Sequence, residues 1–129
     1  MLRVETPDAP TPAGHYSQAI VHSGLVFVSG QLPVLPDRRQ APVGSIEEQT
    51  ELTLRNVGII LEAAGSGLDY VLQMTIYISD VELWPRVNAV YAAVMGESRP
   101  ARAIVPIQEL RHGYQIEIQA VAAVRGATV

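Results

Sequence analysis

The sequence predicts an α+β fold, in which a mixed sheet carries two helices packed on one face. Residues 45 to 64 and 80 to 95 have apolar residues recurring at helical spacing. Segments with alternating or continuous apolar residues stand before, between and after them. The predicted order is two or three strands, a helix, a strand, a helix and two strands. Residues 1–129 are expected to form a single domain.

The first segments are expected to be strands and loops. Residues 1 to 14 are rich in Pro, Thr and Ala, which predicts an extended lead-in with a turn. The apolar run at 25 to 28 predicts a short buried strand that ends at Ser29-Gly30. Pro33, Pro36 and Pro42 predict that residues 31 to 43 are a loop or a ragged edge.

Local signals mark both ends of the first helix. Ser45 followed by Glu48 is a capping box, which predicts the start of the helix. Gly65 is a C-terminal stop signal. The face expected to be buried consists of Leu54, Val57, Leu61 and Ala64.

The second half begins with an alternating strand at 70 to 79. One face is expected to hold Tyr70, Leu72, Met74, Ile76 and Ile78, and the other Val71, Gln73, Thr75 and Tyr77. Asp80 is expected to cap the second helix. The inner stripe of this helix is expected to be Leu83, Trp84, Val87, Val90, Tyr91 and Val94, and Trp84 and Tyr91 are expected to belong to the core. Strands are expected at 101 to 105 and 115 to 125.

The composition excludes several kinds of chemistry. The chain has no Cys, and all 9 basic residues are Arg, so thiolate and lysine Schiff-base chemistry are both excluded. A net charge of −4 argues against nucleic acid as the main partner. No run approaches ~18 apolar residues and the N-terminus has no apolar core, so no membrane span or signal peptide is expected. The chain is expected to be soluble and cytoplasmic.

Arg102 and Glu117 are the candidate catalytic residues. The guanidinium is a charged fork that matches a carboxylate in two places, and Pro100 stiffens the approach to its strand. Glu117 lies on the polar side of the last strand, and a carboxylate on a neighbouring strand can act as a base toward water. By pattern alone, a solvated surface arginine and the wet face of a half-buried sheet are the more common alternatives.

Other polar residues give weaker signals. His15, His22 and His112 are scattered, with no ligand spacing, so no metal site is expected. The glycines at 65 to 67 end a helix instead of opening one, which is the wrong place for a phosphate loop. Asn88 falls beside the apolar stripe of the second helix, where its amide either caps a backbone group or reaches a ligand.

Four stretches of sequence are informative when taken together. They are GHYSQA at 14–19, VSGQLP at 28–33, VNAVY at 87–91, and PAR at 100–102 with IEI at 116–118. In this order and spacing they resemble the RidA/YjgF family of reactive-intermediate (enamine/imine) deaminases, also called endoribonuclease L-PSP. The segment 56–80 is similar to the family's central helix and strand. The resemblance covers nearly the whole chain.

The resemblance implies a chorismate-mutase-like fold, with a mixed six-stranded sheet and two helices on one face, and a homotrimer with sites in clefts between subunits. The implied reaction is hydrolysis of 2-imino or enamine acids, such as 2-iminopropanoate and 2-iminobutanoate, to 2-keto acids and ammonia, without a cofactor or metal. By position, Arg102 matches the arginine that grips the substrate carboxylate, and Glu117 the glutamate that positions or activates water. The matching cleft residues are Tyr16, Gly30, Asn88 and, through its backbone, Ile104.

The sequence departs from the family pattern at several positions. His15 stands where proline is common, which places a titratable ring at the cleft mouth. Ala103 and Ile104 replace the usual Ser or Thr and Cys, so a side-chain hydroxyl or thiol contact is lost. Gln73 replaces a frequent lysine, and Gln119 replaces a second glutamate, which removes one cause of a raised pKa at Glu117. These changes concern substrate preference more than fold.

Two other functions are compatible with the sequence. The same cleft can serve a non-catalytic module that binds keto acids or a partner protein, and the loss of Ser or Thr and Cys after Arg102 favours this reading. An RNA-cleaving translation inhibitor is the third, but the acidic balance and the absence of Lys argue against it.

Overall fold

The computed structural model describes residues 1–37 and 43–126, so residues 38–42 of the predicted 31 to 43 loop lie outside the described part. The chain forms one six-stranded sheet in the order β1-β2-β3-β6-β4-β5. Among the described strands, β4 and β5 pair in parallel and the other pairs are antiparallel. The strands are β1 (Leu2–Val4), β2 (Ala19–His22), β3 (Leu25–Gln31), β4 (Val71–Ile78), β5 (Ala101–Pro106) and β6 (Ile116–Ala123).

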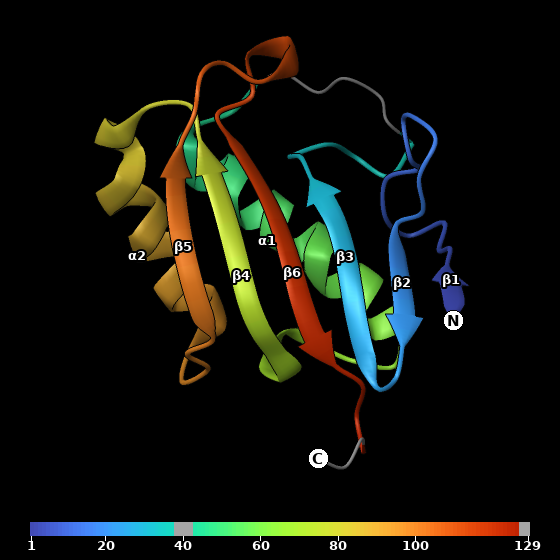
Figure 1. Ribbon diagram of the computed structural model, residues 1–129. Helices are drawn as coiled ribbons and strands as arrows, with labels where there is room; N and C mark the ends of the chain where they lie inside the picture. The colour runs from blue at the N-terminus through green and yellow to red at the C-terminus, as the bar shows by residue number, and fades with distance from the viewer. Residues whose placement is uncertain (38–42, 127–129) are drawn as a thin grey trace.

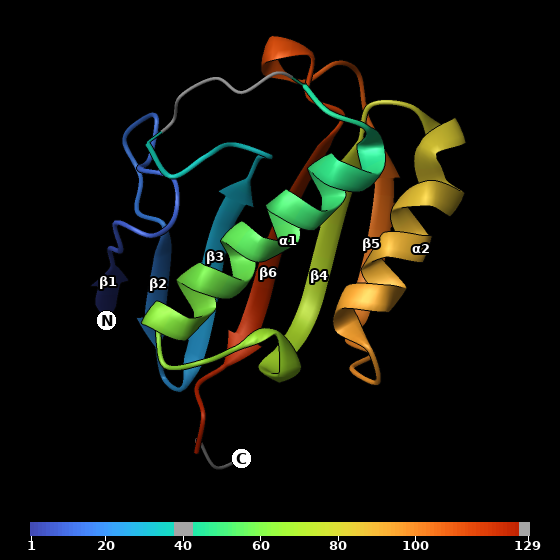
Figure 2. The same cartoon turned by 180° about the vertical axis from the view of Figure 1, so that it is seen from behind.

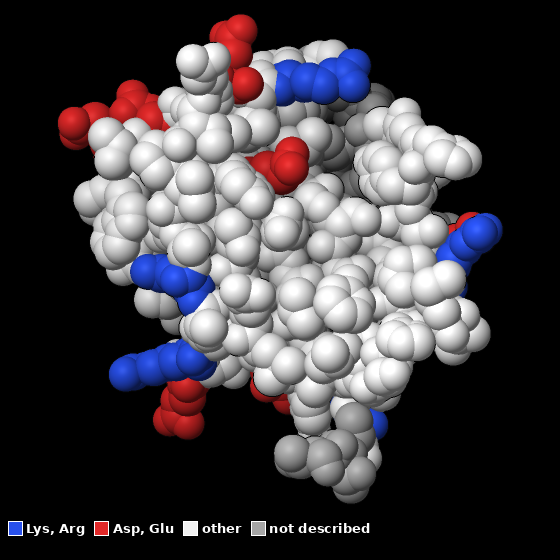
Figure 3. All heavy atoms as spheres, viewed as in Figure 1, with Lys and Arg blue, Asp and Glu red and all other residues white. Residues whose placement is uncertain are grey.

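Helices α1 (Ile46–Ala63) and α2 (Trp84–Met95) lie on one face of this sheet, α1 across its middle and α2 beside β5 (Figures 1 and 2). The α+β fold, the mixed sheet and the element order predicted from the sequence are confirmed. No helix of the described part of the chain covers the other face of the sheet, and we call it the open face. Figure 3 shows that the open face is largely uncharged, with most charged side chains around its rim.

The alternation of β6 sets the two faces of the sheet. Ile116, Ile118, Ala120 and Ala122 are buried under the helices. Glu117 and Gln119 therefore point to the open face, as predicted, because successive side chains of a strand alternate.

The predicted boundaries of α1 are confirmed. Ser45 Oγ accepts a hydrogen bond of 3.1 Å from the Glu48 amide, and the Glu48 carboxylate accepts one of 3.3 Å from the Ser45 amide. Gly65, just past the helix, adopts φ +81°, a conformation that favours glycine and ends the helix. The inner residues Leu54, Val57, Ile60 and Leu61 are fully buried.

The faces predicted for the start of β4 are wrong. Leu72, expected on the same face as the buried Met74, is 49% exposed, whereas Val71, expected on the opposite face, is buried. The register against β6 shifts between Val71 and Gln73, which is the mark of a bulge. An extra residue reverses the alternation on one side of the bulge, so the prediction holds only from Met74 onward.

The predicted start and inner stripe of α2 also need correction. Asp80 caps a short 3-10 turn at 81–83, accepting a hydrogen bond from the Glu82 amide, and α2 begins only at Trp84. Trp84 and Val94 are 40% and 38% exposed and do not belong to the core. The residues of α2 that are buried are Val87, Tyr91 and Met95.

An ion pair joins the two helices. Arg86 Nε and Nη2 each donate a hydrogen bond of 2.7 Å to the Glu47 carboxylate. This bidentate pairing lowers the pKa of Glu47 to about 2. The pair helps to fix α2, which carries Asn88, relative to the rest of the fold. Among the described residues, no helix has the length and apolar character needed to cross a bilayer.

Candidate functional site

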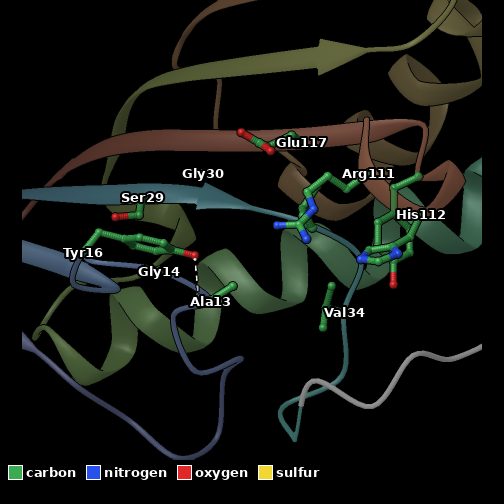
Figure 4. Close-up of a pocket in the computed structure, with 11 residues that line it drawn as sticks. Ala13, Gly14, Tyr16, Ser29, Gly30, Val34, Arg111, His112 and Glu117 are labelled. Carbon is green, nitrogen blue, oxygen red and sulfur yellow. Dashed lines mark hydrogen bonds between the residues drawn. The ribbon is translucent and has the colours of Figure 1, made fainter. Parts of the chain in front are cut away.

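A hollow of about 700 Å³ opens beside the C-terminal end of β3. We call it the Glu117 hollow. Its walls come from the N-terminal segment, the end of β3, a 3-10 turn at 111–113 and β6 (Figure 4). Its lining residues are Ala13, Gly14, Tyr16, Ser29, Gly30, Leu32, Val34, Arg111, His112, Tyr114 and Glu117.

The Glu117 carboxylate is held against the backbone of Gly30. A Cβ at residue 30 would lie 2.5 Å from Glu117 Oε1, so only glycine allows this approach. The register of β3 against β6 shifts between Val28 and Gln31, and this bulge brings residue 30 next to Glu117. Burial of the side chain raises the pKa of Glu117, which makes its carboxylate a stronger proton acceptor.

Tyr16 lines the Glu117 hollow on the side of the N-terminal segment. Its hydroxyl oxygen accepts a hydrogen bond of 3.2 Å from the Ala13 amide, and the residue is 49% exposed. Ser29, in β3, holds the residue that follows Tyr16, because its hydroxyl donates a hydrogen bond of 2.6 Å to the Ser17 carbonyl. Hydrogen bonds therefore hold the backbone before and after Tyr16.

Gln18 attaches the N-terminal segment to the sheet. Its side-chain oxygen accepts a hydrogen bond of 2.7 Å from the Thr6 amide. Its side-chain nitrogen donates to the carbonyls of Thr6 and Pro10, both at 3.0 Å, and of Ala9 at 3.4 Å. This buried side chain holds the segment that leads to Tyr16.

Arg102 lies at a second place, on the helix side of the sheet edge. β5 pairs it with Met74, whose side chain is fully buried under the helices. Its Nη1 donates a hydrogen bond of 2.8 Å to Asn88 Oδ1. Its guanidinium carbon lies 4.8 Å from the ring centroid of Tyr91 and 5.6 Å from that of Trp84, within cation–π range.

A second hollow, of about 510 Å³, opens beside this guanidinium. We call it the Arg102 hollow. It is lined by Asn88, Tyr91, Ala92, Met95, Gly96, Ser98, Arg99, Pro100 and Arg102.

One chain does not bring Arg102 and Glu117 together. β4 lies between β5 and β6, so the expectation that the two residues stand on neighbouring strands is wrong. Their side chains also lie on opposite faces of the sheet and line different hollows. The predicted residues thus fall into two groups: Tyr16, Gly30 and Glu117 in one hollow, and Asn88 and Arg102 in the other.

The structure shows a third role for Asn88, beside the two left open by the sequence, and it corrects the position expected for Trp84. Asn88 accepts a hydrogen bond from Arg102 and so orients the guanidinium. Trp84 was expected in the core but is partly exposed beside that guanidinium. Tyr91 is 6% exposed, and its buried hydroxyl has no hydrogen-bond partner among the described residues. Ile104 is half-buried in β5, paired with Ile76.

Sequence reasoning missed the two basic residues of the Glu117 hollow. Arg111 and His112 line it from the 3-10 turn, a stretch to which the sequence analysis assigned no part in the site. His15, expected at the cleft mouth, is exposed and is not among the lining residues. The available signal was the pair of basic residues followed by Gly113, placed just before the strand that carries Glu117. Among the described residues, no group of three or more His, Asp or Glu could hold a metal ion.

Comparison with known proteins defines the family. Residues 6–124 match the family described as Endoribonuclease L-PSP. A putative endoribonuclease of Thermotoga maritima has a TM-score of 0.92 and 41% identity, over 98% of this chain and 99% of that one. This chain is also similar to Reactive Intermediate Deaminase A, chloroplastic, of Arabidopsis thaliana, at 38% identity over 92% of this chain and 64% of that protein. E. coli TdcF, solved with bound serine, has a TM-score of 0.89 and 32% identity, over 95% and 98% of the two chains.

These matches cover almost the whole chain, and the fold agrees with them. The protein belongs to the RidA/YjgF family, and its mixed sheet with two helices has the chorismate-mutase-like fold.

Proposed function

We propose that this protein is a hydrolytic deaminase of reactive 2-imino and enamine acids, such as 2-iminopropanoate and 2-iminobutanoate. The observation that carries the proposal is the pair of complementary half-sites on one chain. One presents an oriented guanidinium, Arg102, and the other a partly desolvated carboxylate, Glu117. An imino acid has a carboxylate for the first and an electrophilic C=N carbon for a water held by the second.

Arg102 is suited to anchor the substrate carboxylate. Its hydrogen bond to Asn88 and its position over the Tyr91 ring hold the guanidinium without neutralising it, because neither partner is charged. A bidentate contact then fixes the orientation of a small acid, which lowers the entropic part of the barrier. E. coli TdcF, the relative solved with bound serine, supports a small ligand that carries an α-carboxylate.

Glu117 is suited to activate water. As the water oxygen attacks the imine carbon, the carboxylate takes a proton from the water and returns it to the nitrogen, which gives a carbinolamine. The hydroxyl proton of the carbinolamine then passes through the carboxylate to the amino group, the C–N bond breaks and ammonia leaves, so that imine plus water gives keto acid plus ammonia. The raised pKa of Glu117 favours proton uptake in this step.

A complete site needs two subunits, because Arg102 and Glu117 are on opposite faces of one chain. The proposal therefore includes a closed homotrimer in which the edge of one subunit faces the open face of the next. That open face is largely uncharged and includes Phe27, which is 45% exposed, as suits a surface covered on assembly (Figure 3).

A coupled assay tests the proposal. A pyridoxal phosphate-dependent dehydratase releases the imine from serine or threonine, and semicarbazide traps the imine that remains. The protein is expected to lower the trapped adduct and to speed the appearance of keto acid, whereas Arg102→Ala is not. An unchanged amount of adduct would contradict the proposal and favour a non-catalytic binding module. RNA binding that weakens with salt would instead favour the ribonuclease description of the family.

A further inference from the structure

Arg111 places a second guanidinium in the Glu117 hollow. It projects from the 3-10 turn into the space that also receives Glu117 and Tyr16 (Figure 4). Among the described residues, its guanidinium makes no ion pair and no hydrogen bond. In particular, it forms no salt bridge with Glu117, although both line the same hollow.

Other arginines that have a side-chain partner lie outside the Glu117 hollow. Arg86 pairs with Glu47, Arg125 with Glu62, and Arg102 is hydrogen-bonded to Asn88. A guanidinium has five donors in a fixed planar fork, suited to two oxygens of an anion. Arg111 therefore offers this fork to whatever enters the hollow.

The hollow has more room than a three-carbon imine needs, and it holds a guanidinium that the proposed reaction does not use. Its volume of about 700 Å³ lies within the range of sites for much larger ligands. Apart from Glu117, its charged or titratable side chains are Arg111 and His112, together with the phenols of Tyr16 and Tyr114. A ligand that complements this lining carries an anionic group beyond its reacting carbon.

We infer that Arg111 binds an anionic group on the substrate side chain, so that the protein prefers 2-imino acids that carry a second carboxylate. This inference rests on the proposed function, in which Arg102 of a neighbouring subunit takes the first carboxylate. Arg111 then determines specificity and has no part in the chemical step. Imines of this class arise when an amino acid with an acidic side chain is oxidised at its α-carbon.

Two stable keto acids isolate the role of the second carboxylate. The ligands 2-oxoglutarate and 2-oxopentanoate have the same carbon chain, and the first has a carboxylate where the second has a methyl group. Calorimetry should show that the protein binds 2-oxoglutarate about 10-fold more tightly, as expected for a charge-assisted contact in a partly exposed site. Arg111→Gln should remove this preference and leave the affinity for 2-oxopentanoate unchanged. Arg55→Gln, an exposed arginine on α1, is the matched control and should keep the preference.

Turnover separates this inference from the proposed function. Oxidases acting on D-glutamate and D-norvaline supply the two matching imines, and hydrolysis of each is compared in wild type and Arg111→Gln. Rates for both imines that do not depend on Arg111, or equal binding of both keto acids by the wild type, would overturn the inference alone. An equal loss of affinity for both ligands in Arg111→Gln would also overturn the inference, because Arg111 would then hold the first carboxylate. An Arg111-dependent preference without turnover of either imine would overturn the proposed function and leave the anion site standing.

Discussion

Asn88 Oδ1 accepts a hydrogen bond of 2.8 Å from Arg102 Nη1, across the contact between α2 and the edge strand β5. The bond uses one donor of the guanidinium and fixes the direction of the others. The Tyr91 ring, 4.8 Å from the guanidinium carbon, supports the same group from the side. The fork of Arg102 is thus held in place before any ligand arrives, which reduces the entropy lost on binding.

Arg102→Ala should abolish imine hydrolysis without unfolding the protein, because Arg102 is exposed and its loss leaves no buried charge. Arg102→Lys should lose most of the activity, since an ammonium cannot form the bidentate fork. Imine-trapping rates and circular dichroism measure the two effects. Wild-type rates in Arg102→Ala would show that another group anchors the carboxylate.

Glu117→Gln should bind a keto-acid product about as well as the wild type and hydrolyse imine poorly. The amide has nearly the same shape but cannot take a proton from water. Product affinity by calorimetry and turnover by imine trapping give the comparison. If both fall together, Glu117 contributes to binding or structure and not to proton transfer.

The same substitution should reveal a pH-dependent cost in stability. Burial raises the folded-state pKa of Glu117 above its ordinary value of 4.5, so its ionisation is less favourable in the folded chain than in the unfolded one. The cost is absent below the unfolded pKa and appears as pH rises through the folded pKa. The melting temperature of Glu117→Gln relative to wild type should therefore be higher at about pH 7 than at about pH 4. An equal difference at the two pH values would contradict this.

Gly30→Ala should displace the carboxylate while the fold survives. The new Cβ would lie 2.5 Å from Glu117 Oε1, and the flexible glutamate can rotate away more easily than the strand can move. A shift of about 1 Å in a reacting group can lower turnover about 100-fold. Gly58→Ala on α1, where a Cβ would meet Leu68 at 3.4 Å, is the control and should keep its activity. Turnover is measured with thermal melts alongside, and a fully active Gly30→Ala would show that the position of Glu117 is not critical.

Two inactive variants should restore activity when they share one assembly. Arg102→Ala still supplies Glu117, and Glu117→Gln still supplies Arg102, so mixed trimers made by co-expression regain intact sites. Random mixing in equal amounts predicts about one quarter of the wild-type activity. Sedimentation should show a trimer for each variant. An absence of recovery, or an active monomer, would place the complete site within one chain.

Local sequence signals predicted the elements well. The capping box at Ser45 and Glu48 and the stop at Gly65 are confirmed, because these depend on residues close in the chain. The faces of β4 near Leu72 were predicted wrongly, because a bulge depends on the register with β6 and leaves no mark in one strand.

The sequence predicted which residues belong to the candidate site but not how they are arranged in space. Arg102 and Glu117 were both singled out, yet β4 separates their strands, and strand order is a long-range property. Trp84 looked like core because it fits the apolar spacing, but it stays exposed beside Arg102. Arg111 was missed because its turn has no periodicity that would indicate where its side chain points.

The attachment of the N-terminal segment through Gln18 has a consequence for how the family can diversify. Residues 6 to 10 are joined to the sheet by one amide side chain, which makes four hydrogen bonds to their backbone and none that depends on their side chains. The exposed residues of this segment, Pro7 and Asp8, can therefore be exchanged without altering the register of any strand, whereas Ala9 is buried in the core. The segment leads to Ala13, Gly14 and Tyr16, which line one wall of the Glu117 hollow, while Glu117 itself is held by β6 and Gly30. Changes in the stretch between this anchor and Tyr16 can therefore alter the enclosure and leave the reacting groups untouched.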